Sequence, residues 1–123
     1  MANKYADILN EIPLASQVSP SIEELRRFCE GVTEYTQTHG ECKLERGYLV
    51  NFGQEFRVTL IRAENKYKLI LLRAYVPSND LPVLLDTYAD EMVKCNSLKD
   101  LKVALEQFLR RADIQTQIQD WIR

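Results

Sequence analysis

The sequence has little of the residue chemistry on which most small catalytic and metal-binding sites depend. Histidine occurs once, at position 39, and the three cysteines are widely spaced, at positions 29, 42 and 95, without a C-x-x-C motif. A zinc site needs about four closely placed ligands, and a catalytic triad needs a histidine between two oriented partners. We therefore expect no metal and no cofactor. The cysteines are expected to be free and to pack as small apolar residues.

Glycine and long apolar runs are also scarce. The four glycines, at positions 31, 40, 47 and 53, form neither G-x-G-x-x-G nor G-x-x-x-x-G-K, so neither type of nucleotide-binding loop is expected. No stretch approaches the roughly 20 apolar residues of a membrane-spanning helix. Charged residues interrupt the N-terminal segment, which lacks the pattern of a signal peptide. These features predict a cytoplasmic protein that does not contact a membrane.

The overall amino-acid composition is that of an ordinary globular domain. Of the 123 residues, 46% are hydrophobic and 28% are charged, with a net charge of −2. A chain of this length buries roughly two-thirds of its unfolded surface, enough for a core without metals or disulfides. We expect residues 1–123 to form a single α+β domain. Its predicted architecture is an antiparallel meander of three to five strands flanked by N-terminal and C-terminal helices.

Helical periodicity marks the N-terminal side. A first helix is predicted to end at Pro13, because the residue before a proline is pushed out of the helical region. A second helix is predicted to begin at Ser21, which forms an S-x-x-E capping box with Glu24, and to end near Gly40. The apolar face of the first helix comprises Tyr5, Ile8, Leu9 and Ile12.

From residue 41 to residue 76 the apolar period changes to two, which is typical of strands. The alternation predicts strands at 48–52 and 56–61, and a longer strand at 66–76 after a turn at residues 64–65. In this register Ile61 pairs with Lys68 and Arg57 pairs with Leu72. The strand 66–76 is apolar on both faces, which is typical of a central strand covered on both sides.

Residues 80–95 fit two structures. Their apolar spacing matches a helix, whereas the short loop at 77–80 and the need of strand 66–76 for neighbours favour a hairpin. We favour the hairpin. The C-terminal part is predicted to be helical from a second capping-box-like start at Ser97 and Asp100. Its last turns are strongly apolar and must dock onto another part of the fold.

Two groups of polar residues could support catalysis. If residues 80–95 were helical, Asp86 and Asp90 would stack beside Glu91, as an acid–base pair or a divalent-ion site requires. His39 and Cys42 form a local pair around Gly40. A solvated polar surface explains the carboxylates, and a helix-capping histidine beside a packed cysteine explains the pair, so we prefer these structural interpretations.

A basic sheet face is the third candidate site. Arg57, Lys66 and Lys68 are expected to share one face with Thr59, where they could bind an anion or a nucleic acid. Base stacking would need exposed aromatic rings, and these two strands are not expected to place one there. The negative net charge also argues against nucleic acid.

A surplus of apolar surface favours a protein interface. The candidate interface residues lie on the sheet and at the C-terminus: Ile61, Ile70, Leu72, Trp121 and Ile122. Our leading hypothesis is a small non-enzymatic protein-interaction module, such as an adaptor, a chaperone-like or an immunity-type protein. It would bind a protein partner or itself, as a homodimer. The alternatives are a nucleic-acid or anion binder and an enzyme of unrecognised type.

Overall fold

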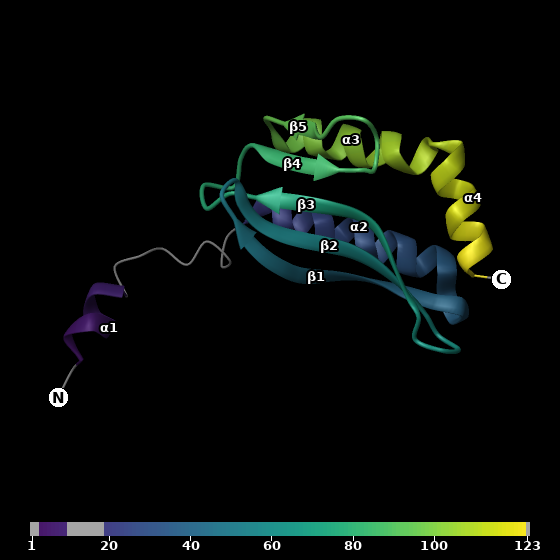
Figure 1. The fold of residues 1–123 in the computed structure, drawn as a ribbon, viewed down its shortest axis with the longest axis horizontal. Helices are drawn as coiled ribbons and strands as arrows, with labels where there is room; N and C mark the ends of the chain where they lie inside the picture. Colours follow the sequence, from purple (N-terminus) through teal and green to yellow (C-terminus); the bar gives the residue numbers. More distant parts are fainter. Residues whose placement is uncertain (1–2, 10–18, 123) are drawn as a thin grey trace.

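Five antiparallel strands in sequence order form the centre of the structure, a computed structural model that describes residues 3–9 and 19–122 (Figure 1). The predicted α+β meander is confirmed, and so is the hairpin within residues 80–95. The expected end of the first helix at Pro13 lies outside the described residues. The strands are β1 (Gly40–Val50), β2 (Gly53–Arg62), β3 (Lys68–Val76), β4 (Val83–Asp86) and β5 (Val93–Cys95). The helices are α1 (Lys4–Leu9), α2 (Pro20–Thr36), the 3-10 helix η2 (Gln37–His39), α3 (Leu98–Arg110) and α4 (Ala112–Trp121).

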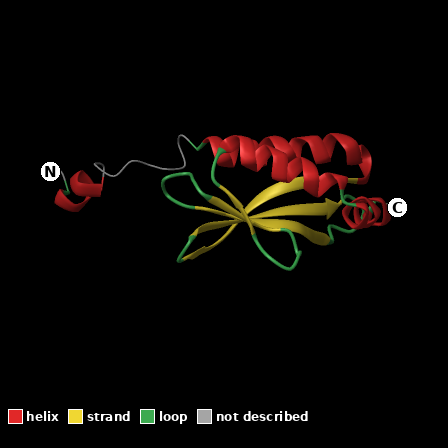
Figure 2. Cartoon of the chain, turned by 90° about the horizontal axis from the view of Figure 1, so that it is seen from above, coloured by secondary structure: helices red, strands yellow, loops and turns green. Residues whose placement is uncertain are grey.

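The helices cover one face of the sheet. Helix α2 packs against β1 and α3 against β5. The edge-on view in Figure 2 shows the long helices on one side of the sheet. Helix α4 turns across one end of the sheet (Figure 1). No helix within residues 19–122 lies over the other face, which we call the open face. Within residues 19–122, helices therefore cover the central strand β3 on one side only.

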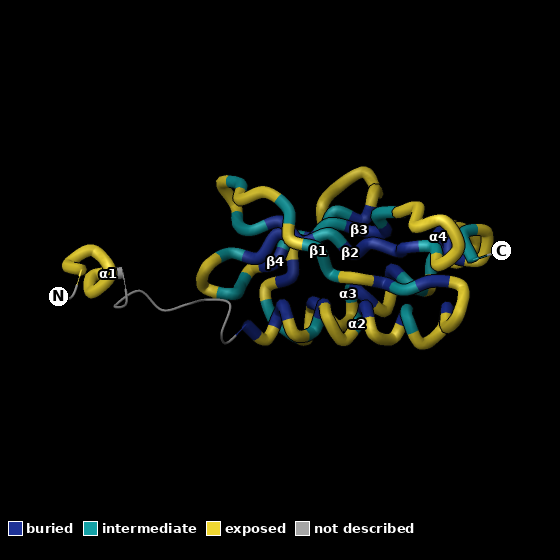
Figure 3. The backbone as a smooth tube through the Cα atoms, turned by 90° about the horizontal axis from the view of Figure 1, so that it is seen from below, coloured by how far each residue is buried: buried dark blue, intermediate teal, exposed yellow. Residues whose placement is uncertain are grey.

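The core lies between this helical layer and the sheet, where the most deeply buried residues gather (Figure 3). On β2 every second side chain points toward the helices, as a strand with one covered face requires. Helices α2 and α3 contribute apolar residues at spacings of three and four. The fully buried core side chains include Leu25, Val58, Leu60, Leu72, Leu85, Leu101 and Phe108.

Helix α2 begins two residues earlier than the capping box predicted. Ser19 is the N-cap: its hydroxyl accepts a hydrogen bond of 3.1 Å from the Ile22 amide, and Pro20 occupies the first turn. Ser21 is instead buried inside the first turn and bonds to Asp80 of the β3–β4 loop. The second predicted cap is confirmed, since the Ser97 hydroxyl accepts from the Asp100 amide at 3.1 Å.

A β-bulge in β3 changes the predicted pairing. Ile61 pairs with Lys68 as expected, but Thr59 pairs with Ile70 and Val58 with Leu72, so Leu71 is an extra residue. Beyond the bulge Arg57 pairs with Arg73, which corrects the expected pairing of Arg57 with Leu72. Both Leu71 and Leu72 are buried, at 1% and 0% exposure. The extra residue changes which side chains of β3 face the helices: residues before and after the bulge alternate in opposite phase. The apolar run in β3 is therefore explained by the bulge and not by two apolar faces.

The apolar C-terminus docks against the end of the sheet. Ile114 and Ile118 of α4 are buried in the core. Arg62, the last residue of β2, donates from Nε to the Trp121 carbonyl at 2.9 Å and holds its guanidinium 4.5 Å from the centre of the indole ring. None of the helices in the described ranges is long and apolar enough to cross a membrane.

The buried thiol of Cys95 is expected to make the stability of the fold decrease at alkaline pH. Burial, with a smaller contribution from Asp100, raises the pKa of this thiol from 9.0 to about 11. A group whose pKa is raised on folding stabilises the protein below its unfolded pKa, and that contribution is lost as the pH rises through the folded pKa. The free energy of unfolding should therefore fall between pH 9 and pH 11, by roughly 1–3 kcal/mol from this group. Urea denaturation at several pH values measures this fall. The free energy of unfolding of the Cys95→Ala variant should decline less with pH than that of the unmodified chain, and an equal decline would contradict an origin in Cys95.

Candidate functional site: the open face of the sheet

The open face presents a mixed polar surface whose residues follow from strand alternation. On β2 the residues between the core positions point away from the helices, and their partners on β1, β3, β4 and β5 share that side. Both signs of charge occur along neighbouring strands. The face comprises Glu41, Lys43, Glu45, Glu55, Arg57, Thr59, Ile61, Lys68, Ile70, Arg73, Tyr75, Leu84, Asp86 and Lys94.

A buried carboxylate lies at the centre of the strongest group on this face. Glu55 is only 7% exposed and accepts a hydrogen bond of 2.7 Å from Nε of Arg57. Its second oxygen lies 3.8 Å from Nε of Arg73 on the adjacent strand. One carboxylate therefore neutralises part of the charge of two arginines that sit opposite each other across β2 and β3.

Two tyrosines lie against these arginines. The guanidinium of Arg57 is 5.5 Å from the ring centre of Tyr48, and that of Arg73 is 5.8 Å from the ring centre of Tyr88. Arg73 also donates to the Tyr88 hydroxyl at 2.9 Å. Tyr48 is 75% exposed and Tyr88 is 52% exposed, so both rings remain available to solvent. We call these five residues the arginine–tyrosine cluster: Tyr48, Glu55, Arg57, Arg73 and Tyr88.

Gly47 makes room for the cluster. The register of β1 against β2 shifts between Arg46 and Leu49, which marks an irregularity opposite Glu55. A side chain at Gly47 would overlap the carboxylate of Glu55. The side-chain amide of Gln54 closes the same irregularity, donating to the carbonyls of Gly47 and Glu55 at 2.9 and 3.1 Å.

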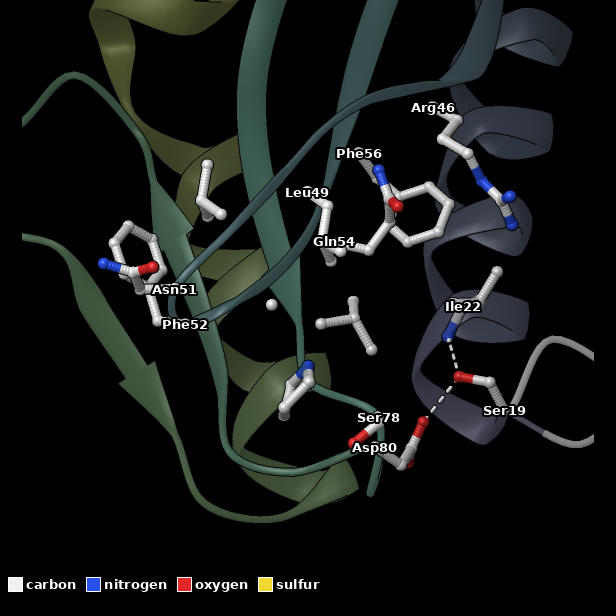
Figure 4. A pocket seen from close by; sticks show the side chains of 14 residues that line it. Ser19, Ile22, Arg46, Leu49, Asn51, Phe52, Gln54, Phe56, Ser78 and Asp80 are labelled. Atoms are coloured by element: carbon white, nitrogen blue, oxygen red, sulfur yellow. Dashed lines mark hydrogen bonds between the residues drawn. The ribbon is translucent and has the colours of Figure 1, made fainter. Parts of the chain in front are cut away.

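A cavity of about 530 Å³ lies between the β1–β2 turn, the β3–β4 loop and the start of α2 (Figure 4), and none of the five cluster residues lines it. Phe52 lines the cavity and also packs edge-on against Tyr75 of the open face, with ring centres 4.8 Å apart. Burial, aided by nearby Glu55, raises the pKa of Tyr75 above its usual value. Asp80 lines the cavity too, but its carboxylate is engaged by Ser19 and Ser21 and supports the fold.

The structure brings together two of the three residues of the candidate basic face. Arg57 and Lys68 lie on the open face, whereas Lys66 lies in the β2–β3 turn with a φ of 61°. Lys68 donates to a carboxylate oxygen of Glu45 at 2.8 Å, and this hydrogen bond lowers the pKa of Glu45. Arg57 and Lys68 are thus each paired with a carboxylate, Glu55 and Glu45 respectively. The bulge also places Tyr75 of β3 on this face, where these strands were expected to supply no aromatic ring, but Tyr75 is buried, at 8% exposure.

The candidate interface residues are divided among three locations. Ile61 and Ile70 lie on the open face, where Ile61 is buried and Ile70 is half-buried. Leu72 faces the helices because of the bulge and is fully buried. Trp121 and Ile122 are half-buried at the end of the sheet, next to Arg62.

The two groups considered for catalysis are not assembled as a helix or dyad would require. Asp86 ends β4 and accepts from the Tyr88 amide at 3.1 Å, while Asp90 and Glu91 are exposed in the following loop. His39 is exposed, whereas the Cys42 thiol is buried and faces Cys29. Within residues 3–9 and 19–122 no three potential metal-ligating side chains are grouped closely enough to hold an ion.

Most of the arginine–tyrosine cluster was not predicted from the sequence. Tyr48 alternates visibly with Val50 and Phe52, and this signal could have placed it on a sheet face. Arg73 and Tyr88 carried no such signal, because the first depends on the bulge and the second on the loop after β4. Comparisons of the chain with protein-family models, with curated proteins and with solved structures each gave no match.

Proposed function

We propose that this chain is a non-enzymatic protein-interaction module that binds a protein partner, or a second copy of itself, through the open face. The observation that carries the proposal is the arginine–tyrosine cluster on a sheet face that no described helix covers. Arginine and tyrosine are enriched among the residues that dominate binding energy at protein interfaces. An adaptor, a chaperone-like protein or an immunity-type protein would use such a surface.

The cluster is suited to binding because it is already ordered. Glu55 holds Arg57 and Arg73 in place by contacts of 2.7 and 3.8 Å, so their side chains lose less freedom when a partner covers them. The two exposed tyrosines offer broad, rigid contact area with hydroxyl groups at their tips. A partner would therefore meet a prepared surface rather than a set of mobile side chains.

The charges of the face favour a protein partner over a nucleic acid. The face carries five basic residues, namely Lys43, Arg57, Lys68, Arg73 and Lys94, and four acidic ones, namely Glu41, Glu45, Glu55 and Asp86. A phosphate backbone would meet this near balance without a net attraction. A protein surface with both signs of charge can match it, and a second copy of the chain has such a surface.

Nucleic-acid binding is the second candidate, favoured by the aromatic rings that lie beside Arg57 and Arg73. Retention on heparin or on mixed single-stranded oligonucleotides at low salt is its test. Retention that falls with salt and with loss of Tyr48 would assign the open face to nucleic acid instead of protein.

Removal of the two exposed tyrosines tests the leading proposal. We expect the Tyr48→Ala/Tyr88→Ala double variant to lose at least tenfold in affinity for the partner, since hot-spot truncations cost roughly 2 kcal/mol or more. Light scattering and sedimentation measure self-association, and affinity capture from the native cell followed by mass spectrometry measures other partners.

Tyr35→Ala provides the matched control, because Tyr35 is 61% exposed on α2, in the helical layer. The control should bind as the unmodified chain does. Two results together would contradict the proposal: the unmodified chain is strictly monomeric, and the double variant captures the same proteins as the unmodified chain.

A further inference from the structure

Two cysteine thiols lie against each other beneath the outer edge of the sheet. Cys29 belongs to α2 and Cys42 to β1, and both side chains line the same groove between these two elements. Both residues are buried, at 4% and 6% exposure. The third thiol, Cys95, is fully buried on β5, at the opposite edge of the five-stranded sheet. The structure thus forms one cysteine pair and leaves the third cysteine apart.

Thr33 fixes the position of Cys42 relative to helix α2, which carries Cys29. It lies one helical turn after Cys29, so both side chains leave α2 on the same face and reach β1. The Thr33 hydroxyl accepts from the Cys42 amide at 2.8 Å and donates to the Cys42 carbonyl at 3.1 Å. These bonds fix the backbone of Cys42 relative to the helix turn that carries Cys29.

Small reagents can reach this pair. A groove of about 520 Å³ runs between α2 and the edge strand β1, and both cysteines line it. Charged side chains of Arg26, Glu30 and Lys43 line it as well. The groove admits a molecule of the size of water or hydrogen peroxide, whereas the low exposure of the two residues disfavours a bulky adduct on either sulfur.

We propose that Cys29 and Cys42 form a dithiol that hydrogen peroxide converts into an intramolecular disulfide joining α2 to β1. The sulfur of Cys29 attacks peroxide, takes one oxygen atom to become a sulfenic acid and releases water. The sulfur of Cys42 then attacks the sulfenic sulfur, an S–S bond forms, and the departing hydroxyl leaves as water with the Cys42 proton. Two thiols are oxidised, and one peroxide is reduced to two waters.

The order of the two steps follows from the surroundings of Cys42. Its hydrogen bond with Cys29, together with burial, raises the pKa of the Cys42 thiol far above its usual range. A thiol that keeps its proton is a poor first nucleophile. We therefore assign the first attack to Cys29 and the second to Cys42, and in each step the attacking sulfur gives up its proton.

The test is peptide mapping of the native full-length chain after brief exposure to hydrogen peroxide. Free thiols are then alkylated in denaturant, and the digest is examined without reduction. We expect one dominant cross-linked species that joins the peptides containing Cys29 and Cys42, with Cys95 alkylated. The Cys95→Ser variant should give the same cross-link, and the Cys29→Ala variant should leave Cys42 reduced at the same exposure.

The same oxidation in guanidinium chloride controls for chance pairing, because the unfolded chain brings Cys95 into competition. The native chain should favour the Cys29–Cys42 pair by at least tenfold over pairs with Cys95, and the unfolded chain should not. Equal yields of the different pairs in the native chain, or three thiols that remain alkylatable, would overturn the proposal.

Discussion

Replacing Asp80 with alanine is expected to lower the free energy of unfolding by about 3–4 kcal/mol. Asp80 belongs to the β3–β4 loop but serves the first turn of α2. Its carboxylate accepts from the Ser19 hydroxyl at 2.5 Å, the Ser21 hydroxyl at 3.0 Å and the Ser21 amide at 3.2 Å. The negative charge also lies at the helix N-terminus, where the helix dipole favours it.

The size of this effect has two sources. Ser21 is fully buried, so the variant leaves its hydroxyl without a carboxylate partner inside the protein. Asp80 also has a φ of 76°, a backbone conformation that aspartate and asparagine tolerate better than alanine does. Alanine therefore loses the side-chain bonds and strains the loop at once.

Urea denaturation of three variants separates these contributions. Asp80→Asn keeps an acceptor oxygen and tolerates the positive φ, so it should lose less than half as much stability as Asp80→Ala. Asp90→Ala removes an exposed loop carboxylate and should change stability by less than about 0.5 kcal/mol. If Asp80→Ala lost no more stability than Asp90→Ala, the bonds from the β3–β4 loop to the start of α2 would not contribute to stability.

Replacing Glu55 with glutamine is expected to cost about 2–3 kcal/mol of stability. The change removes the charge that lies between Arg57 and Arg73 while keeping nearly the same shape. Removing one partner of a buried ion pair is costly because the opposite charge remains. Here two arginines remain, but each keeps 30% of its side-chain surface in water, which holds the cost below that of a fully buried pair.

A second substitution tests whether charge is the cause. In the Glu55→Gln/Arg57→Gln double variant only one unpaired arginine remains, so part of the lost stability should return. Glu64→Gln is the matched control, since Glu64 is exposed in the β2–β3 turn. A loss in the double variant equal to the sum of the two single losses would show that Glu55 and Arg57 are not coupled, and would contradict charge pairing as the cause.

Much of the fold was predictable because apolar periodicity and turn signals are local properties. The change of period after Gly40 located the sheet, and the short loop before Asp80 supported the hairpin that the structure contains. The N-cap at Ser19 was missed because Ser19 and Ser21 both precede the same apolar stripe. Only the position of Asp80, far away in the sequence, explains why Ser21 is buried within the helix.

The open face was less predictable because one extra residue reverses strand parity. Leu71 and Leu72 are adjacent in the sequence, yet both are buried, so alternation beyond them inverts. Without the bulge, Arg73 would point toward the helices and Leu72 toward solvent. No local pattern distinguishes this bulge from a strand that is apolar on both faces, and the cluster around Glu55 depends on it.

The presence of a single uncovered sheet face has a consequence for assembly geometry. The edge strand β1 begins with its backbone bonded to Thr33 and contains an irregularity before its end, while the opposite edge, β5, has only three residues. Such edges discourage strand addition. If the open face meets its own copy about a two-fold axis, the contact uses up the one uncovered sheet face that residues 19–122 present. Association of this kind stops at the pair and cannot extend into a filament.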